Sequence, residues 1–372
     1  MLTGLTSSVQ AELDAFFADL ANRAKRRRVV SAQAFAKARY KLHHDLFQPL
    51  LTQLVALIEG QCPSPRWHGR RIVAADASKL RFTKQKDGIR SVVEAVAFAL
   101  FLPGIELCLA AHLYPTADGE RQMLFEHLAH LTEDDLLVLD RGYPSAWLGA
   151  VLSQARIAFC IRCDMASTFK VVLTFARSGL AESHVTLPAP YRRDAEAYEC
   201  QATPTTVRLI RVVLKNGRSH VLMTSLLDAQ RYPAADFGAL YHARWRIEEA
   251  FKRFKHRLSL EHTSGMSWHA AHQDFGAKAI CDNLNALAAW LAHDQHRPPP
   301  DQKSTKVNRT QAFAQLKRHL GRWLLRTLPS LATLTEALQE IARNLQTYVP
   351  GRQQPRPPRP KPHKSPAYKG NP

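Results

Sequence analysis

The chain has 372 residues, of which 45% are hydrophobic, so it is long enough to form two or three domains with sizeable cores. Its 51 Lys and Arg against 32 Asp and Glu give a formal charge of +19, which indicates a polyanionic partner: nucleic acid first, an anionic membrane surface second. No uninterrupted apolar run reaches the roughly 18 residues of a membrane-spanning helix, no signal peptide is evident, and six scattered cysteines fit a reducing cytoplasm.

Residues 1–65 are predicted to form a helical region that binds DNA. The stretch "VQAELDAFFADLA" has apolar residues at helical spacing, and Ser31 is a candidate N-cap for the helix in "SAQAFAKARYKL". Between these helices lies a basic run made of Lys25, Arg26, Arg27 and Arg28. A run of this kind either contacts DNA phosphates or forms a solvated surface, and the composition of the region leaves both interpretations open.

Residues 66–170 are predicted to form the first part of a ribonuclease H-like core. Three apolar strand candidates, "RIVAADAS", "VVEAVAFALF" and "ELCLAAHLYP", are joined by short links. The helix "ERQMLFEHLAHL", the strand "DLLVLD", the helix "SAWLGAVLSQA" and the strand "RIAFCIR" follow. This order predicts an α/β fold with a mixed sheet and flanking helices, as in ribonuclease H-like proteins.

Residues 171–226 are predicted to form an all-β subdomain inserted into this core. Within them, Asn216 and Gly217 form a two-residue hairpin signal between two apolar runs. Residues 227–295 are mostly helical and are predicted to complete the core.

The C-terminal part of the chain divides into a helical region and a basic tail. Residues 296–348 are predicted to be helical, with helices near 309–325 and 331–346. Residues 349–372 contain eight prolines and six Lys or Arg with no acid, so this stretch cannot form a core and is predicted to be disordered. It is either an arm that binds the DNA backbone nonspecifically or a solubilising tail.

The segment "YHARWRIEEAFKRFKHRL", residues 241–258, combines an apolar stripe with a narrow polar face. At about 100° per residue, four polar side chains fall within about 60° of one another on a helix. They are Tyr241, Arg244, Glu248 and Lys255. The stripe consists of Leu240, Ile247, Phe251, Phe254 and Leu258. The polar face therefore borders buried surface, and either i,i+4 charge pairs or a functional site would account for it.

A single glutamate would need further carboxylates to hold a divalent cation for phosphoryl transfer. Asp76 ends the predicted strand "RIVAAD", and Asp140 ends "DLLVLD". Ligands of α/β proteins collect in the crevice at such strand ends, although each residue by itself could equally be a turn or capping residue.

Together these segments resemble one known family. The spacing Y-x2-R-x3-E-x6-K, preceded in order by "VAADAS" and "LVLDRGYPS", is similar to the YREK signature and the two Asp segments of the IS-four family of bacterial insertion-sequence transposases. The similarity extends over roughly residues 25 to 290. Members of this family are DDE enzymes, which use a carboxylate triad.

The resemblance implies a function and a set of site residues. Asp76, Asp140 and Glu248 would be catalytic and would bind Mg²⁺ or Mn²⁺ as two ions, and Tyr241, Arg244 and Lys255 would contact DNA phosphates. The protein would bind the terminal inverted repeats as a dimer in the bacterial cytoplasm, cleave at the ends, and join the 3′-OH ends to target DNA. An inactive relative that acts as a repressor, or a nuclease without strand transfer, remain the alternatives.

One departure from the family concerns tryptophan. Some relatives use a tryptophan of the β insertion to flip a base during a DNA hairpin step. The six tryptophans of this chain all lie outside residues 171–226, at Trp67, Trp147, Trp245, Trp268, Trp290 and Trp323. The hairpin route is therefore in doubt here.

Two further patterns are weaker. Cys160 and Cys163 form a CxxC within a predicted strand, but no second pair completes a zinc site. The run "HHD", residues 43–45, and the pair His269 and His272 are interpreted as helix surface.

Overall fold

The computed structural model describes residues 8–21, 25, 28–163, 169–214, 217–256, 258–295, 305–325 and 330–347. The chain forms two compact units, and each combines segments that are far apart in the sequence. The first, here called the helical unit, comprises Met1–Ile58, Leu80–Glu94 and Arg253–Pro372. The second, the sheet unit, comprises Glu59–Lys79 and Ala95–Lys252.

The sheet unit is organised by a mixed sheet with strand order β4-β3-β2-β5-β6-β9-β8-β7, and β1 pairs with β2 at one end. The strands are β1 (Arg66–Trp67), β2 (Arg70–Lys86), β3 (Ile89–Leu102), β4 (Leu107–Pro115), β5 (Asp135–Leu139), β6 (Ala158–Cys163), β7 (Glu182–Leu187), β8 (Thr205–Val213) and β9 (Ser219–Thr224). β2, β5 and β6 pair in parallel, whereas β3–β4, β6–β9, β8–β9 and β7–β8 pair antiparallel.

Five strands of this sheet, β4, β3, β2, β5 and β6, confirm the predicted ribonuclease H-like class. Three consecutive strands, β4-β3-β2, are followed across the sheet by β5 and β6, which run parallel to β2. All five residues of β5 are buried, as expected for a central strand with both faces covered. A parallel connection of this kind needs a crossover helix, and α5 (Ala146–Gln154) supplies it between β5 and β6.

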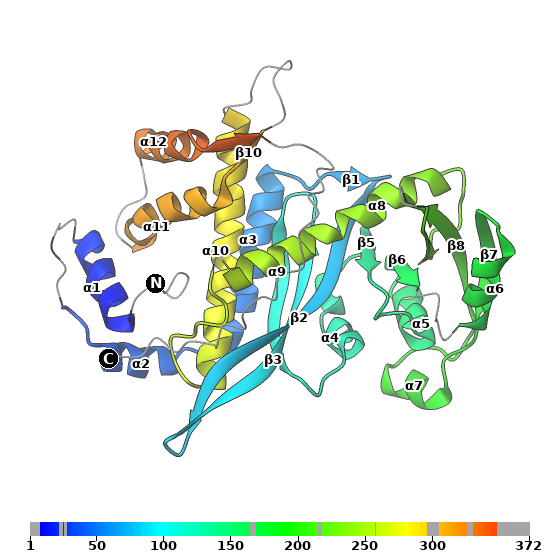
Figure 1. The fold of residues 1–372 in the computed structure, drawn as a ribbon, viewed down its shortest axis with the longest axis horizontal. Helices are drawn as coiled ribbons and strands as arrows, with labels where there is room; N and C mark the ends of the chain where they lie inside the picture. The colour runs from blue at the N-terminus through cyan, green and yellow to red at the C-terminus, as the bar shows by residue number, and fades with distance from the viewer. Residues whose placement is uncertain are drawn as a thin grey trace. The chain divides into compact units, whose positions relative to one another are not determined.

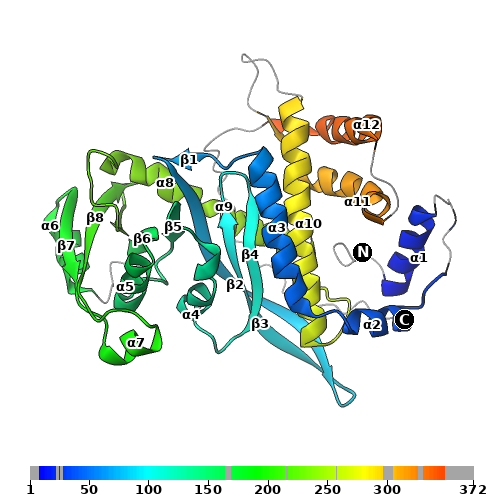
Figure 2. The same ribbon diagram turned by 180° about the vertical axis from the view of Figure 1, so that it is seen from behind.

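Helices cover both faces of this sheet (Figures 1 and 2). They are α4 (Glu120–Glu126), η2 (Leu128–His130), α5, α6 (Lys170–Ser178), α7 (Arg192–Ala197), η3 (Ala234–Asp236), α8 (Phe237–Ala243) and most of α9 (Trp245–His256). α8 packs Phe237 and Leu240 against Leu136, Cys160 and Leu222 of the strands. α4 and α5 lie on the opposite face from α8 (Figure 2).

Two details of the sheet differ from the predictions. Residues 171–226 are not all-β, because α6 and α7 lie in or beside this stretch, and β7, β8 and β9 extend the main sheet. Asp76 is not at the end of a strand either, because β2 continues to Lys86. The predicted hairpin is confirmed: β8 and β9 pair antiparallel next to Gly217, whose φ is +78°, while Asn216 lies outside the described residues.

The helical unit contains the N-terminal helices, the C-terminal helices and the tip of the β2–β3 hairpin. Its elements are α1 (Val9–Leu20), α2 (Ala32–Tyr40), η1 (His44–Leu46), α3 (Phe47–Gln61, with its end in the sheet unit), α10 (Trp268–Gln295), β10 (Thr305–Val307), α11 (Arg309–Leu325), α12 (Leu331–Ala342) and β11 (Leu345–Thr347). The Ser31 side chain accepts a hydrogen bond from the amide of Ala34, so its predicted role as an N-cap is confirmed. α11 and α12 were also predicted, and they share a core with α10.

Among the described residues, none of the helices combines the length and the apolar composition that a bilayer crossing requires.

Candidate active site

Asp76 and Asp140 lie on neighbouring parallel strands of the sheet unit. The parallel register pairs Ala74 of β2 with Val138 of β5. Continuing this register by two residues places Asp76 opposite Asp140, which directly follows β5. Because neighbouring strands are about 4.8 Å apart, the two carboxylates belong to one short stretch of the sheet. The sequence predicted this proximity, although it assigned Asp76 to a strand end.

Glu248 reaches the same part of the sheet unit from a helix. α8 ends at Ala243 and α9 begins at Trp245, but Arg244 between them keeps helical backbone angles, with φ −54° and ψ −34°. The predicted helical face is therefore preserved across this junction. The predicted apolar stripe is confirmed, since each of its residues is buried: Leu240, Ile247, Phe251, Phe254 and Leu258.

Arg244 connects the helix to the strand. Its Nη2 lies 2.6 Å from Oε1 of Glu248, and its Nη1 lies 3.8 Å from Oδ2 of Asp76. The guanidinium is only 4% exposed and lies over the Tyr241 ring, 5.7 Å from its centroid. Arg244 therefore joins two of the three predicted acids in a partly desolvated setting, where an ion pair is screened less by solvent.

The environment of Asp76 disfavours its negative charge. Burial raises the pKa of Asp76 to about 7; Arg244 opposes the shift, whereas Asp140 and Glu120 add to it. Like charges placed together in a buried site raise a carboxyl pKa in this way. Arg244 therefore offsets only part of the effect of burial on Asp76.

Two residues that the sequence did not single out complete this group. Glu120, in the first turn of α4, lies near Asp140: a Cβ added to Gly142 would lie 3.1 Å from Oε2 of Glu120 and 3.2 Å from Oδ1 of Asp140. Tyr143 is fully buried, and among the described residues its hydroxyl has no hydrogen-bond partner. Burial raises the pKa of Tyr143, and Glu120, Asp76 and Asp140 add to the shift.

Tyr241 is buried in the core beneath α8, at 7% exposure. Burial raises its pKa, while Arg244 and Arg162 of β6 oppose the shift. Tyr241 Oη and Arg162 Nε are both buried without a hydrogen-bond partner in the described part of the chain. Arg162 therefore adds a further cation to the Tyr241 side of the site, and only the three-dimensional structure shows it.

A cavity of about 430 Å³ lies on the Glu120 side of the site. It is lined by Gly119, Glu120, Arg121, Gln122, Gly142, Trp147 and Tyr198. The rings of Trp147 and Tyr198 stack with their centroids 3.6 Å apart. Asp140 borders this cavity through Gly142, whose amide donates to Oδ1 of Asp140 at 2.7 Å.

The other predicted DNA contacts lie in the helical unit. Lys255 is in the last turn of α9, and burial lowers its pKa while Glu261 opposes the shift. Lys25 is exposed, and Arg28 is 3.7 Å from Asp14 with most of its side chain in solvent. Arg26 and Arg27 lie outside the described residues.

The three acids supply the hard oxygen ligands that Mg²⁺ and Mn²⁺ prefer. Asp140 and Glu120 both add to the raised pKa of Asp76, so these carboxyl groups lie close enough to repel one another, and a divalent cation between them would relieve that repulsion. Glu248 is engaged by Arg244. The ligand types therefore suit a divalent cation, but among the described residues the three acids do not lie close enough together to share one as they stand, so cation binding would require them to move closer.

Cys160 and Cys163 do not form such a site. Both thiols are free and buried, and burial raises the pKa of each. They are therefore packed as core residues of β6.

Comparison with known proteins decides the family. The family model described as "Transposase DDE domain" matches residues 67–284, which include Asp76, Asp140, the whole of α9 with Glu248, and residues 268–284 of α10. The chain belongs to the DDE transposase family. This confirms the resemblance found in the sequence.

Individual relatives are more distant. The chain is 24% identical over 243 residues, 62% of its length, to the transposase InsG for insertion sequence element IS4 of Escherichia coli, and it spans 54% of that relative. The chain therefore corresponds to about half of that curated protein. The cryo-EM structure of a piggyBac transposase synaptic complex with hairpin DNA is similar at 12% identity and a TM-score of 0.39, covering 88% of this chain and 67% of the other.

Proposed function

We propose that this protein is a cut-and-paste DNA transposase that cleaves at the terminal inverted repeats of an insertion sequence and joins the 3′-OH ends to target DNA. The observation that carries the proposal is the arrangement around Arg244. One guanidinium contacts Asp76 on β2 and Glu248 on α9, and the β2–β5 register places Asp140 opposite Asp76. A simple amphipathic helix would need no acids from two strands beside it.

Asp76, Asp140 and Glu248 would hold one or two Mg²⁺ or Mn²⁺ ions. When bound there, such ions would lower the pKa of the attacking hydroxyl or water and neutralise charge on the leaving oxygen. Glu120 borders the same space and would add negative charge on the Asp140 side. Because Asp76 has a pKa of about 7, cation binding would have to displace a proton from it below that pH.

The basic residues would bind and orient the DNA. Arg244 is held by Glu248 and Asp76, and its Nε and Nη1 are buried without a hydrogen-bond partner among the described residues, so a phosphate would have to reach them beside the acids to be bound there. Lys255 lies about three turns beyond Arg244, in the last turn of α9, and would contact a second phosphate as a point charge. Lys25, Arg26, Arg27 and Arg28 would contribute backbone contacts from the N-terminal region.

The partners would be double-stranded DNA, as transposon ends and as target, and a second copy of the chain. Processing two ends in one event calls for two active sites, which favours a dimer on DNA. The protein would act in the bacterial cytoplasm in association with the nucleoid.

The test uses a labelled terminal inverted repeat, a supercoiled target, and Mg²⁺ or Mn²⁺. We expect cleavage and joining by the wild type, and loss of both in Asp76→Asn, Asp140→Asn and Glu248→Gln. Glu249→Gln is the matched control, because Glu249 is the exposed neighbour of Glu248 on α9. Activity should survive in this control variant.

Each alternative gives its own result. DNA binding by the wild type without cleavage would favour a repressor, and cleavage without joining would favour a nuclease. Wild-type activity in the Asp76 or Asp140 variant would overturn the assignment of the site.

A further inference from the structure

The helical unit brings together two histidine-rich segments that are far apart in the sequence. His43, His44 and Asp45, at the start of η1, offer one ligand atom each, and these atoms all lie within 4.8 Å of one another. Asp45 lies between the two histidines: its Oδ2 is 3.0 Å from Nδ1 of His43, and its Oδ1 is 3.3 Å from Nε2 of His44. Among the described residues, this is the one group of three or more His, Cys, Asp or Glu side chains that lie close enough together to share an ion.

Helix α10 adds two further imidazoles to this cluster. The ring of His44 lies 4.5 Å from that of His272 and 5.5 Å from that of His269, measured between centroids. The ring of His43 stacks on that of His44 at 4.8 Å. Four histidines and one aspartate therefore meet where η1 packs against α10, an arrangement that neither segment indicates by itself.

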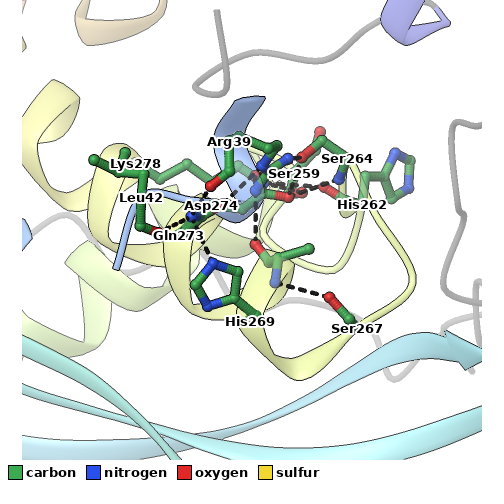
Figure 3. A network of polar contacts seen from close by, with 11 residues as sticks. Arg39, Leu42, Ser259, His262, Ser264, Ser267, His269, Gln273, Asp274 and Lys278 are labelled. Carbon is green, nitrogen blue, oxygen red and sulfur yellow. Dashed lines mark hydrogen bonds and ion pairs between the residues drawn. The ribbon is translucent and has the colours of Figure 1, made fainter. Parts of the chain in front are cut away.

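His269 is in contact with Gln273, which links α2 and α10 (Figure 3). Gln273 accepts a hydrogen bond from Nε of Arg39 at 2.7 Å, which fixes the orientation of its amide. The amide nitrogen of Gln273 donates to the carbonyl oxygens of Arg39 and Leu42 at 2.8 and 2.5 Å, and it lies 3.0 Å from Nε2 of His269. His269 is therefore a neighbour of the cluster that packs beside Gln273.

His44 has the features of a ligand. Its Nε2 faces Oδ1 of Asp45, so this nitrogen is the one that can share an ion with the carboxylate, while its Nδ1 is buried and has no hydrogen-bond partner in the described part of the chain. His43 and Asp45 are open to solvent, with side chains 72% and 66% exposed, so an ion can reach the site.

We propose that His43, His44 and Asp45 bind one transition-metal cation of the zinc class, with His272 of α10 as the fourth ligand. Two or three imidazole nitrogens and one carboxylate oxygen suit Zn²⁺, Co²⁺ or Ni²⁺ and do not suit Mg²⁺, which prefers oxygen ligands. The site differs in this respect from the all-carboxylate group of the sheet unit.

The consequence of such a site would be a clamp within the helical unit. α2 is already attached to α10 through Arg39, which pairs with Asp274 at 3.1 Å and bonds to Gln273. A metal ion held by η1 and by His272 would fix the next segment of the chain to the same helix. It would thereby stabilise the docking of the N-terminal helices, since an ion that binds only the folded state adds to its stability.

The test is metal binding by the full-length, tag-free protein. Calorimetric titration with Zn²⁺ should show that His43→Ala and Asp45→Asn lose one equivalent of bound metal, or bind it at least about tenfold more weakly. His68→Asn is the matched control, because His68 also pairs with an aspartate, Asp236, at 2.8 Å. This variant should bind Zn²⁺ as the wild type does. His43 is exposed, so His43→Ala should fold, which the far-ultraviolet circular dichroism without metal verifies.

Two further measurements test the ligand set. The visible absorption of bound Co²⁺ should indicate nitrogen ligands in the wild type and should change in His272→Ala. Zn²⁺ should raise the midpoint of thermal unfolding in the wild type but not in His43→Ala. Equal Zn²⁺ stoichiometry and affinity in wild type and His43→Ala, or an equal loss in the His68→Asn control, would overturn the proposal.

Discussion

At the scale of single residues, Arg244 has the most demanding position in the sheet unit. Its guanidinium contacts two carboxylates from different elements and is almost completely buried. A planar, forked cation can serve two carboxylates in fixed directions, whereas an ammonium group is a point charge on a flexible stem. The position therefore requires arginine, and the positive charge alone is not sufficient.

The substitution Arg244→Lys keeps the positive charge at this position and removes the forked arrangement of the donor groups. We expect end cleavage to fall at least about tenfold, because lysine cannot keep Glu248 and Asp76 aligned at once. Cleavage rates on a labelled inverted repeat measure this effect. Arg253→Lys is the control, since Arg253 is also on α9 and pairs with a buried acid, Asp282, at 3.2 Å. If both variants lose cleavage equally, the effect is one of folding and the special position of Arg244 is refuted.

Lys278 offers a test that depends on pH. It is fully buried in α10, and its Nζ donates to the carbonyl oxygens of Ser259 and His262 at 3.0 and 3.1 Å. Burial lowers its pKa to about 8, while Asp274 opposes the shift. The folded state therefore binds fewer protons than the unfolded state between about pH 8 and pH 10.4, the ordinary lysine value, so the contribution of Lys278 to stability rises with pH through this window.

Comparison with Lys278→Met isolates this contribution. The difference in unfolding free energy between wild type and variant should move in favour of the wild type by up to about 3 kcal/mol from pH 7 to pH 10. Urea denaturation at several pH values measures the difference. A constant difference across this range would show that burial does not lower the pKa of Lys278 in the folded state.

The residue scale also shows what the sequence could and could not supply. Asp76, Asp140 and Glu248 stand out because a charged residue beside an apolar strand, or on the border of a helical stripe, is visible in one dimension. Glu120 and Tyr143 approach these acids only through the packing of α4 and of the loop after β5. No local pattern encodes that approach. The same is true of His272 beside His44.

At the scale of elements, helices were predicted better than strand lengths. The stripe of α8 and α9 and the N-cap of α2 are local signals, and the structure confirms both. β2 was predicted to end near Asp76 because polar residues follow it, yet it continues to Lys86. Leu80 and Phe82 are buried in this extension, and their alternation with exposed or partly exposed neighbours was the available signal.

The packing of α10 against the start of α3 gives an element-scale prediction. A Cβ added to Gly276 would lie 2.5 Å from Cβ and 2.6 Å from Cγ of Phe47, closer than atoms can pack. Gly276→Ala should therefore destabilise the helical unit by about 1–3 kcal/mol, despite the better helix propensity of alanine. The midpoint of thermal unfolding should fall.

Gly60 provides the opposite case. It lies in α3, and a Cβ there would meet nothing within 4 Å among the described atoms. Gly60→Ala should raise the stability by up to about 1 kcal/mol through helix propensity. If Gly276→Ala were as stable as Gly60→Ala, the close approach of α10 to Phe47 would be disproved.

At the scale of the whole molecule, the two units do not follow the order of the chain. The tip of the β2–β3 hairpin belongs to the helical unit, where the amide of Gln85 donates to Met266 at 3.0 Å and Phe82 contacts Trp268 with ring centroids 5.0 Å apart. A reading of the sequence by composition divides a chain into consecutive segments. It could therefore predict the sheet and the helices, but not that one hairpin contributes to both units.

Net charge is the other property of the whole molecule, and part of it resides in residues 349–372. This stretch carries six Lys or Arg and no acid, so its removal lowers the formal charge from +19 to +13. If it contacts the DNA backbone, each phosphate that it neutralises releases counterions and makes binding more salt-dependent. If it only keeps the protein soluble, it leaves the salt dependence of binding unchanged.

Deleting residues 349–372 should therefore weaken nonspecific DNA binding and flatten its salt dependence. Full engagement of six cations would reduce the slope of log K against log salt by up to about 5, at roughly 0.9 per phosphate. Fluorescence anisotropy on a random duplex, across a series of salt concentrations, measures the slope. A full-length variant with the six Lys and Arg replaced by Gln should match the deletion, whereas replacing the eight prolines by Ala should leave the slope near that of the wild type. An unchanged slope in the Gln variant, together with lower solubility, would identify the stretch as a solubilising tail, because counterion release depends on charge and not on chain length.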